Sequence, residues 1–171
     1  MLNRLLRVLR HRWEKDSRHT LPHNALERLQ LRVAVSEQQH SGEIRICVEA
    51  ALPSSYLWRT DSMAALLRQR AISQFGRLRV WDTERNNGVL IYLCLAEHAI
   101  ELVADRGVNQ VAPAAYWEQT VASLGAALGA GAFEDGLGLA VDTVGKLLQQ
   151  HFALAAGEIN PNELPDAPVV D

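Results

Sequence analysis

The chain has 171 residues, of which 48% are hydrophobic and 22% charged, a composition typical of one folded domain and not of a disordered or fibrous chain. Its net charge of -3 provides no overall basic field, which argues against nucleic acid as a partner. Two cysteines, Cys47 and Cys94, are too few for a disulfide framework and are expected to be buried thiols. The sequence shows no secretory signal and no apolar run of about 20 residues that could span a membrane. We therefore expect a cytoplasmic protein.

Residues 1–20 are predicted to form a basic amphipathic helix and a linker. Apolar residues recur there at helical spacing, at Leu2, Leu5, Leu6, Leu9 and Trp13. Residues 1–18 also carry six bases against two acids. The apolar stripe has two possible uses: it could pack on the domain or on a second copy, or it could bind an anionic membrane surface. The second use would place the protein at the periphery of a membrane.

Residues 21–154 are predicted to form one α/β domain. Periodicity and capping signals indicate the order helix, strand, helix, strand, strand, helix, helix, over residues 22–40, 43–50, 60–76, 88–96, 99–104, 113–128 and 134–148. The first strand alternates apolar with polar residues, so we expect it to be half-buried. Residues 155–171 contain three prolines, four acids and no periodicity, which predicts a disordered acidic tail.

The connections between these elements predict the topology of the sheet. A strand-helix-strand crossover makes the first two strands parallel, and the tight connection that follows makes the third antiparallel to the second. The expected fold is a small mixed sheet with helices on both faces, an α/β/α sandwich. In this arrangement the loop Asp82–Gly88 and the segment Asp105–Gly107 lie at one end of the sheet, and the loop Pro53–Thr60 lies at the other.

Four oxygen-bearing side chains are candidate metal ligands at the first of these ends: Asp82, Glu84, Asn87 and Asp105. Carboxylate and amide oxygens suit a hard cation such as calcium or magnesium, although the spacing does not fit an EF-hand loop. The alternative is a polar turn, in which Asn87 and Gly88 supply permissive backbone angles and Asp105 caps the next turn. The sequence contains no nucleophile elbow, phosphate-binding P-loop or dinucleotide-binding glycine motif.

Four segments together resemble the TPM domain, the family of thylakoid acid phosphatase-like and photosystem II repair proteins. Residues 41–46 (SGEIRI) are similar to a strand of that family, and residues 87–91 (NGVLI) to its hairpin strand. Residues 100–107 (IELVADRG) and 133–137 (FEDGL) follow in the same order. The departures from the family pattern are Asn86 where relatives carry an acid, and Asp105 where many carry glycine.

The resemblance implies an α/β/α sandwich and two functional hypotheses. Family members have been linked to assembly or maintenance of membrane protein complexes, to divalent-cation binding by loop carboxylates, and to weak acid phosphatase activity. The first hypothesis is a non-enzymatic interaction domain that supports membrane-associated protein partners. The alternative is a phosphomonoesterase dependent on calcium or magnesium, in which Asp82, Glu84 and Asp105 hold the metal and Arg85 and Arg106 hold the phosphate.

Overall fold

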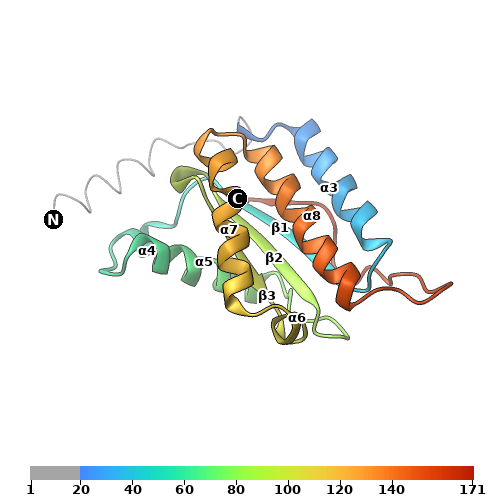
Figure 1. The fold of residues 1–171 in the computed structure, drawn as a ribbon. Helices are drawn as coiled ribbons and strands as arrows, with labels where there is room; N and C mark the ends of the chain where they lie inside the picture. The colour runs from blue at the N-terminus through green and yellow to red at the C-terminus, as the bar shows by residue number, and fades with distance from the viewer. Residues whose placement is uncertain (1–19) are drawn as a thin grey trace.

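The computed structural model describes residues 20–171 (Figure 1). The amphipathic helix predicted for residues 1–20, with its proposed membrane contact, lies outside the described residues apart from its final position. The elements in chain order are α3 (His23–Glu37), β1 (Glu43–Glu49), α4 (Ser54–Leu57), α5 (Met63–Arg77), β2 (Gly88–Cys94), the 3-10 turn η1 (Leu95–Glu97), β3 (Ala99–Ala104), α6 (Arg106–Val111), α7 (Ala114–Gly129), α8 (Phe133–His151) and β4 (Val169–Val170).

The sheet has four strands in the order β3-β2-β1-β4. Strands β1 and β2 are parallel, with Glu43 opposite Gly88, whereas β2 and β3 are antiparallel, with Val89 opposite Ala104. Both orientations confirm the predicted mixed sheet. Strand β4 pairs in parallel with β1, which leaves β3 and β4 as the two edge strands.

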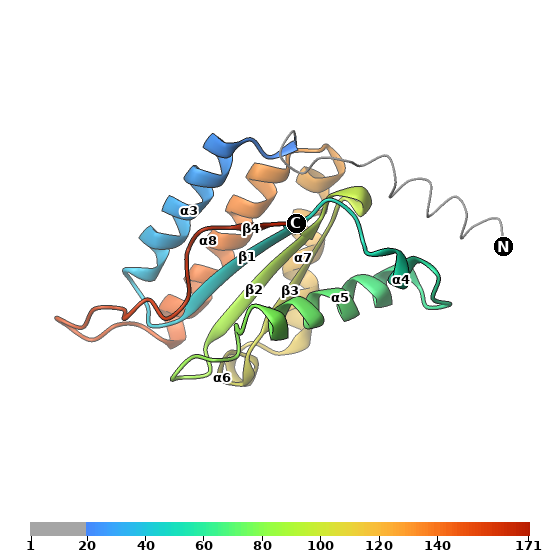
Figure 2. The ribbon, with the colours of Figure 1, turned by 180° about the vertical axis from the view of Figure 1, so that it is seen from behind.

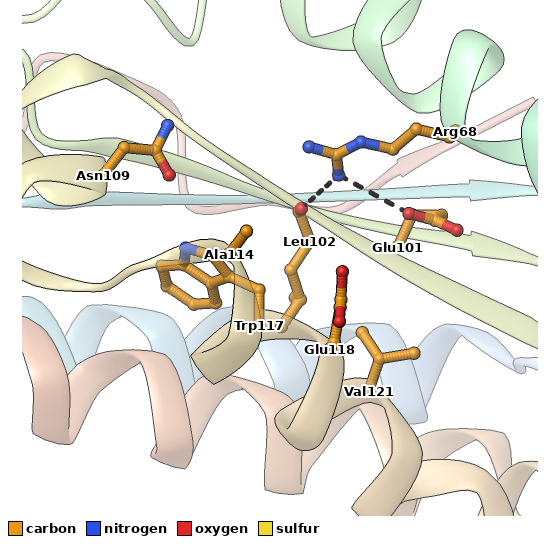
Figure 3. A pocket seen from close by; sticks show the side chains of 8 residues that line it. All are labelled: Arg68, Glu101, Leu102, Asn109, Ala114, Trp117, Glu118 and Val121. Carbon is orange, nitrogen blue, oxygen red and sulfur yellow. Dashed lines mark hydrogen bonds and ion pairs between the residues drawn. The ribbon is translucent and has the colours of Figure 1, made fainter.

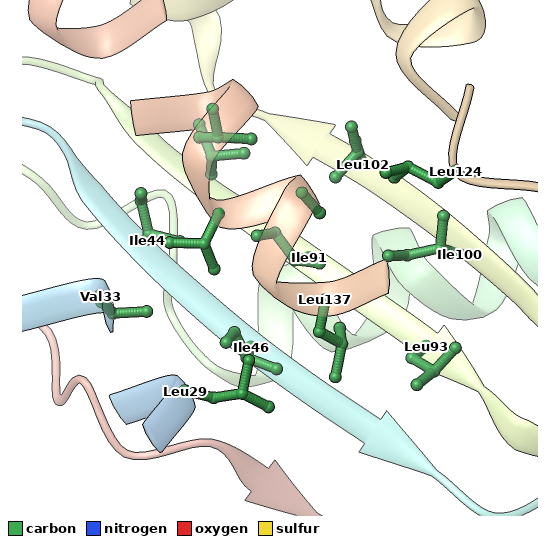
Figure 4. Packing of buried hydrophobic residues seen from close by; sticks show 14 of the residues in the cluster. Leu29, Val33, Ile44, Ile46, Ile91, Leu93, Ile100, Leu102, Leu124 and Leu137 are labelled. Carbon is green, nitrogen blue, oxygen red and sulfur yellow. The ribbon is translucent and has the colours of Figure 1, made fainter. Parts of the chain in front are cut away.

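Helices cover both faces of the sheet, as the sequence predicts. Helices α3, α7 and α8 lie on one face, and α5 lies on the other (Figure 2). Alternate residues of each strand point into the first layer, where Ile44, Ile46, Ile91 and Leu93 meet Leu137 of α8 (Figure 4). This layer is the larger apolar core. The remaining strand residues meet α5.

Strand β1 differs from its prediction because every one of its seven residues is buried. The alternation of apolar and polar residues is real, but the polar face is covered by α5 and by the C-terminal segment. Arg45 is 9% exposed and Glu49 is 3% exposed. The polar side chains of this strand are therefore held by protein partners and not by solvent.

The prediction of a disordered tail over residues 155–171 is wrong for residues 164–170, which run alongside β1 in the fold. The guanidinium of Arg45 donates hydrogen bonds to the backbone oxygens of Pro165 and Ala167, and Leu164 is only 8% exposed. Val169 and Val170 then form β4. Without this segment, β1 would present unpaired backbone groups at a sheet edge, which explains why a tail without periodicity is recruited.

The two thiols lie where the sequence places them, inside the fold. Cys47 and Cys94 are free and buried, and burial raises the pKa of each to about 12. Within residues 20–171, no helix is both long enough and apolar enough to cross a bilayer.

Candidate functional site

The loops that precede β2 and follow β3 meet at one end of the sheet, which confirms their predicted placement. The backbone N–H of Asp105 donates to the oxygen of Gly88 at 2.9 Å, and that of Gly107 donates to the oxygen of Asn86 at 2.9 Å. The guanidinium of Arg106 adds a bond of 2.7 Å to Oδ1 of Asn86.

Gly107 makes this close approach possible. A Cβ atom at this position would lie 2.7 Å from the backbone oxygen of Asn86 and 2.8 Å from that of Arg85. Any side chain would force the two loops apart. Because Gly107 has no side chain, Asp105 can lie next to the start of β2.

Asn87 and Asp105 are the two predicted ligands that lie inside this end of the sheet. Nδ2 of Asn87, a fully buried residue, donates to the backbone oxygen of Ser41 at 3.0 Å. Asp105 is the N-cap of α6, and its Oδ1 accepts from the N–H of Arg106 at 2.7 Å. The remaining oxygens, Oδ1 of Asn87 and Oδ2 of Asp105, are buried and have no hydrogen-bond partner among the described residues. These two oxygens are unpaired acceptors enclosed between the loops.

Asp82 and Glu84 are used differently. Asp82 pairs with Arg79 at the surface, and the carboxylate of Glu163 holds the backbone N–H of Glu84 at 3.0 Å. In the part of the chain that is described, no three His, Cys, Asp or Glu side chains gather in a way that could hold a metal ion. The three acids of the predicted metal set are therefore not brought together. The polar-turn alternative fits better in one respect, since Asp105 is a cap. Its other part is wrong: the left-handed residue of the turn is Asn86, at φ 52°, and neither Asn87 nor Gly88 has a positive φ.

The two arginines of the phosphatase hypothesis also have protein partners. Arg85 donates to Oγ of Ser41 at 3.1 Å and to Glu158 at 2.8 Å, while Arg106 contacts Asn86. A phosphate would have to compete with these internal hydrogen bonds.

A cleft of about 430 Å³ lies beside β3, between α5 and α7 (Figure 3). It is lined by Arg68, Glu101, Leu102, Asn109, Ala114, Trp117, Glu118 and Val121. We call it the β3 cleft. Nη1 of Arg68 donates to the backbone oxygen of Leu102 at 2.6 Å and lies 3.5 Å from Oε2 of Glu101. Burial raises the pKa of Glu101, and the nearby charge of Arg68 opposes that rise.

The apolar wall of the β3 cleft contains a hydrogen-bond donor that is not satisfied. Trp117 is 7% exposed, and its Nε1 is buried without an acceptor in the described part of the chain. Sequence analysis missed the cleft, because Trp117 follows the helical pattern of a core residue. The sequence signal that could have indicated the cleft was Glu101, an acid in the middle of the apolar run of residues 99–104.

A second group of acids lies where the C-terminal segment crosses α3 and β1. Oε1 of Glu37 accepts from the N–H of Ile44 at 2.8 Å, and Oε2 of Glu43 accepts from the N–H of Leu164 at 3.1 Å. Burial raises the pKa of Glu37 to about 9, and the charges of Glu43 and Asp166 add to the rise. Glu37 and Asp166 also line a cavity of about 380 Å³.

Comparisons with known proteins agree with this architecture. The BA42 protein of the psychrophilic bacterium Bizionia argentinensis, solved by NMR, matches with a TM-score of 0.71 and 24% identity over 88% of this chain and 95% of that one. The N-terminal domain of a protein from P. gingivalis, also solved by NMR, matches with a TM-score of 0.55 and 18% identity over 79% and 83% of the two chains. A search of curated proteins found no match.

At these identities the two structures show a shared fold and nothing about activity. A scan against protein families is more informative, because residues 15–147 match the TPM domain. That match covers most of the chain and includes all four segments on which the resemblance rests. The chain belongs to the TPM domain family.

Proposed function

We propose that this TPM domain is a non-enzymatic protein-binding domain that acts beside membrane-associated partners and binds them in the β3 cleft. The observation that carries the proposal is the cleft itself. It combines an apolar wall with charges of both signs at an edge of the sheet. Such a combination of apolar surface with a few polar groups is typical of recognition sites.

The loop end of the sheet supports binding over hydrolysis. Phosphomonoester hydrolysis needs charged groups that converge on one phosphate. Here Asp82 pairs with Arg79, Glu84 is exposed, and Arg106 is bonded to Asn86. Arg106 thus links the two loops, and Asp82 is engaged in a local ion pair.

Selection from a random peptide library displayed on phage tests the proposed function. Peptides enriched on the full chain should be lost on Val121→Arg, which places a long cation in the β3 cleft. They should be retained on Val35→Arg, which adds the same cation to an exposed position of α3. Failure to enrich any peptide, or equal loss on both variants, would contradict binding in the cleft.

A metal-assisted phosphatase is the second candidate, and one observation favours it. Oδ1 of Asn87 and Oδ2 of Asp105 are buried oxygens without partners at the same end of the sheet. If calcium or magnesium binds there, titration should shift the amide resonances of residues 82–88 and 105–107 together. Turnover of a generic phosphate ester that disappears in Asp105→Asn would then establish the enzyme. No shift at millimolar metal would exclude the site.

The membrane part of the proposal rests on the basic sequence of residues 1–18. We expect the full chain to bind anionic vesicles weakly and to be released as ionic strength rises. Reversing two charges, Arg7→Glu with Arg10→Glu, should abolish sedimentation with these vesicles. Binding that is indifferent to salt and to this reversal would show that the basic sequence of residues 1–18 does not bind the membrane surface.

A further inference from the structure

We infer that the outer edge of β3 accepts an extended segment of the partner protein as an added strand. The segment would place an apolar side chain against α7 and, two positions away, a basic side chain near Glu118. This inference rests on the proposed function and specifies its mode of binding. It is carried by the hydrogen-bonding state of the β3 edge and by the composition of the β3 cleft.

The backbone of β3 shows which of its residues face away from the sheet. In an antiparallel pair, successive residues direct their backbone groups alternately toward the partner strand and away from it. The N–H of Asp105 donates to Gly88 of the β2 side, so Leu102 and Ala104 have their backbone groups on the outer edge. No strand of residues 20–171 pairs with that edge, since β3 ends the sheet.

Side chains, and not another strand, satisfy the outer carbonyls. The oxygen of Leu102 accepts from Arg68 at 2.6 Å, and that of Ala104 accepts from Nδ2 of Asn109 at 2.7 Å. Both donors are themselves exposed, and Arg68 already lies 3.5 Å from Glu101. An incoming main-chain N–H can therefore replace Arg68 at Leu102 while the guanidinium keeps Glu101 as its partner. Strand addition uses edges of this kind.

The two sides of the edge differ in chemistry. An added strand would direct alternate side chains toward α7 and toward α5. Toward α7 it meets the apolar surfaces of Trp117 and Val121, together with the unsatisfied Nε1 of Trp117 (Figure 3). An apolar side chain fits this wall.

The charges of the β3 cleft favour a basic segment. Glu101 and Glu118 face one cation, Arg68, so the lining carries an excess of acid. Glu118 is exposed on α7, on the same side as the apolar wall. Residues two positions apart on a strand share a side, which gives a sequence pattern in which an apolar residue and a lysine or arginine are separated by one residue.

The test uses the full chain and the blocked peptide Ac-TTVTKTT-NH2, in which valine and lysine share a side. We expect millimolar peptide to shift the amide resonances of Leu102 and Ala104 and the indole resonance of Trp117. Hydrogen exchange of the Leu102 amide should slow by about tenfold when the peptide is at about ten times its Kd. No shift at millimolar peptide would overturn the inference, and the phage selection would still decide the proposed function.

Two peptides that differ only in the position of one N-methyl group test strand addition directly. Methylation at valine and methylation at the following threonine remove amides on opposite sides of the peptide, so only one of them should abolish binding. Equal effects of the two would overturn strand addition while leaving the β3 cleft as a binding site.

The charge argument has its own controls. Glu118→Lys should weaken binding by about threefold, and replacing the peptide lysine by glutamate should restore it. Glu27→Lys, an equivalent change at an exposed position of α3, should have no effect. A second copy of the chain is the competing occupant. Dimers in solution with a protected Leu102 amide before any peptide is added would overturn the inference.

Discussion

The two faces of the sheet are buried by different means. The face under α3, α7 and α8 is filled mainly with aliphatic side chains, which come from the strands, as Ile46 and Ile91 do, and from the helices, as Leu137 does. The face under α5 contains Cys47, Cys94 and Tyr92 together with the acid Glu49. One face depends on packing alone, and the other depends on packing plus directional hydrogen bonds.

Glu49 is the centre of a polar network beneath α5. The hydroxyl of Tyr92 donates to its Oε2 at 2.7 Å, Nε of Arg70 donates at 2.9 Å, and Gln74 adds a further bond. Burial raises the pKa of Tyr92, and the bond to Glu49 raises the pKa of Arg70. Tyr92 and Arg70 thus keep the protons that they donate to Glu49. These directional bonds fix the position of α5 on the sheet in a way that aliphatic contacts cannot.

The largest effect is expected where the polar network is broken. Glu49→Ala leaves the Arg70 guanidinium and the Tyr92 hydroxyl without their shared acceptor inside the fold. The free energy of unfolding should fall by about 3 to 5 kcal/mol, measured by urea denaturation. Glu49→Gln retains an acceptor oxygen and should cost less. Equal losses in the two variants would mean that the negative charge of Glu49, and neither a neutral acceptor oxygen nor side-chain volume, matters on this face.

The aliphatic face should respond to volume instead. Leu137→Ala removes buried methyl groups at the centre of the α8 contact and should cost about 3 kcal/mol in the same denaturation experiment. Leu137→Met conserves most of the volume and should cost less than about 1.5 kcal/mol. If the two substitutions were equally damaging, this face would require a specific shape in addition to volume.

Glu37 introduces pH dependence at the border of the aliphatic face. Its pKa rises from 4.5 to about 9 on folding, so the unfolded chain releases this proton at lower pH. The stability that it contributes is complete below pH 4.5 and is lost as the pH rises toward 9. Glu37→Gln should therefore stabilise the protein at pH 8 by about 1 to 3 kcal/mol and change little at pH 4.5. Denaturation at the two pH values measures this, and an equal change at both would contradict it.

The smallest effect is expected at the surface of the α3 and α8 pair. Arg32 and Asp142 join these helices through a bidentate ion pair, in which Nε lies 2.7 Å from Oδ1 and Nη2 lies 2.6 Å from Oδ2. The hydrogen bond to Arg32 lowers the pKa of Asp142. Because the pair is partly exposed, Asp142→Asn should cost less than about 1 kcal/mol, and added salt should reduce the difference. A larger, salt-independent loss would show that the pair is part of the core.

The fold was largely predictable because its signals are local. Connections between neighbouring segments determine that β1 and β2 are parallel and that β3 is antiparallel to β2. The burial of the polar face of β1 by α5 and the C-terminal segment was not predictable in this way. Alternation marks Arg45 and Glu49 as different from their neighbours, but it does not reveal that the C-terminal segment and α5 supply their partners.

The candidate site was predictable only in part, for the same reason. Strand ends place Asn87 and Asp105 at one end of the sheet. The partner of Asp82 is Arg79, three residues earlier, a rotamer choice that the sequence pattern does not record. The β3 cleft combines Arg68 of α5 with residues of β3, α6 and α7, which lie more than 30 positions later, and Trp117 has the spacing of an ordinary core residue.

The pairing of β4 with β1 has a consequence for the order of folding. Arg45 and its partner Pro165 are 120 positions apart, whereas the β2 and β3 hairpin closes over a few residues. Contacts of such long range bear the largest loop-closure entropy, and β4 contributes only two residues to the ladder. During synthesis, the parallel pair and the hairpin can assemble before the last segment leaves the ribosome. Until then β1 is an exposed edge, and the nascent chain is most open to mispairing in this interval.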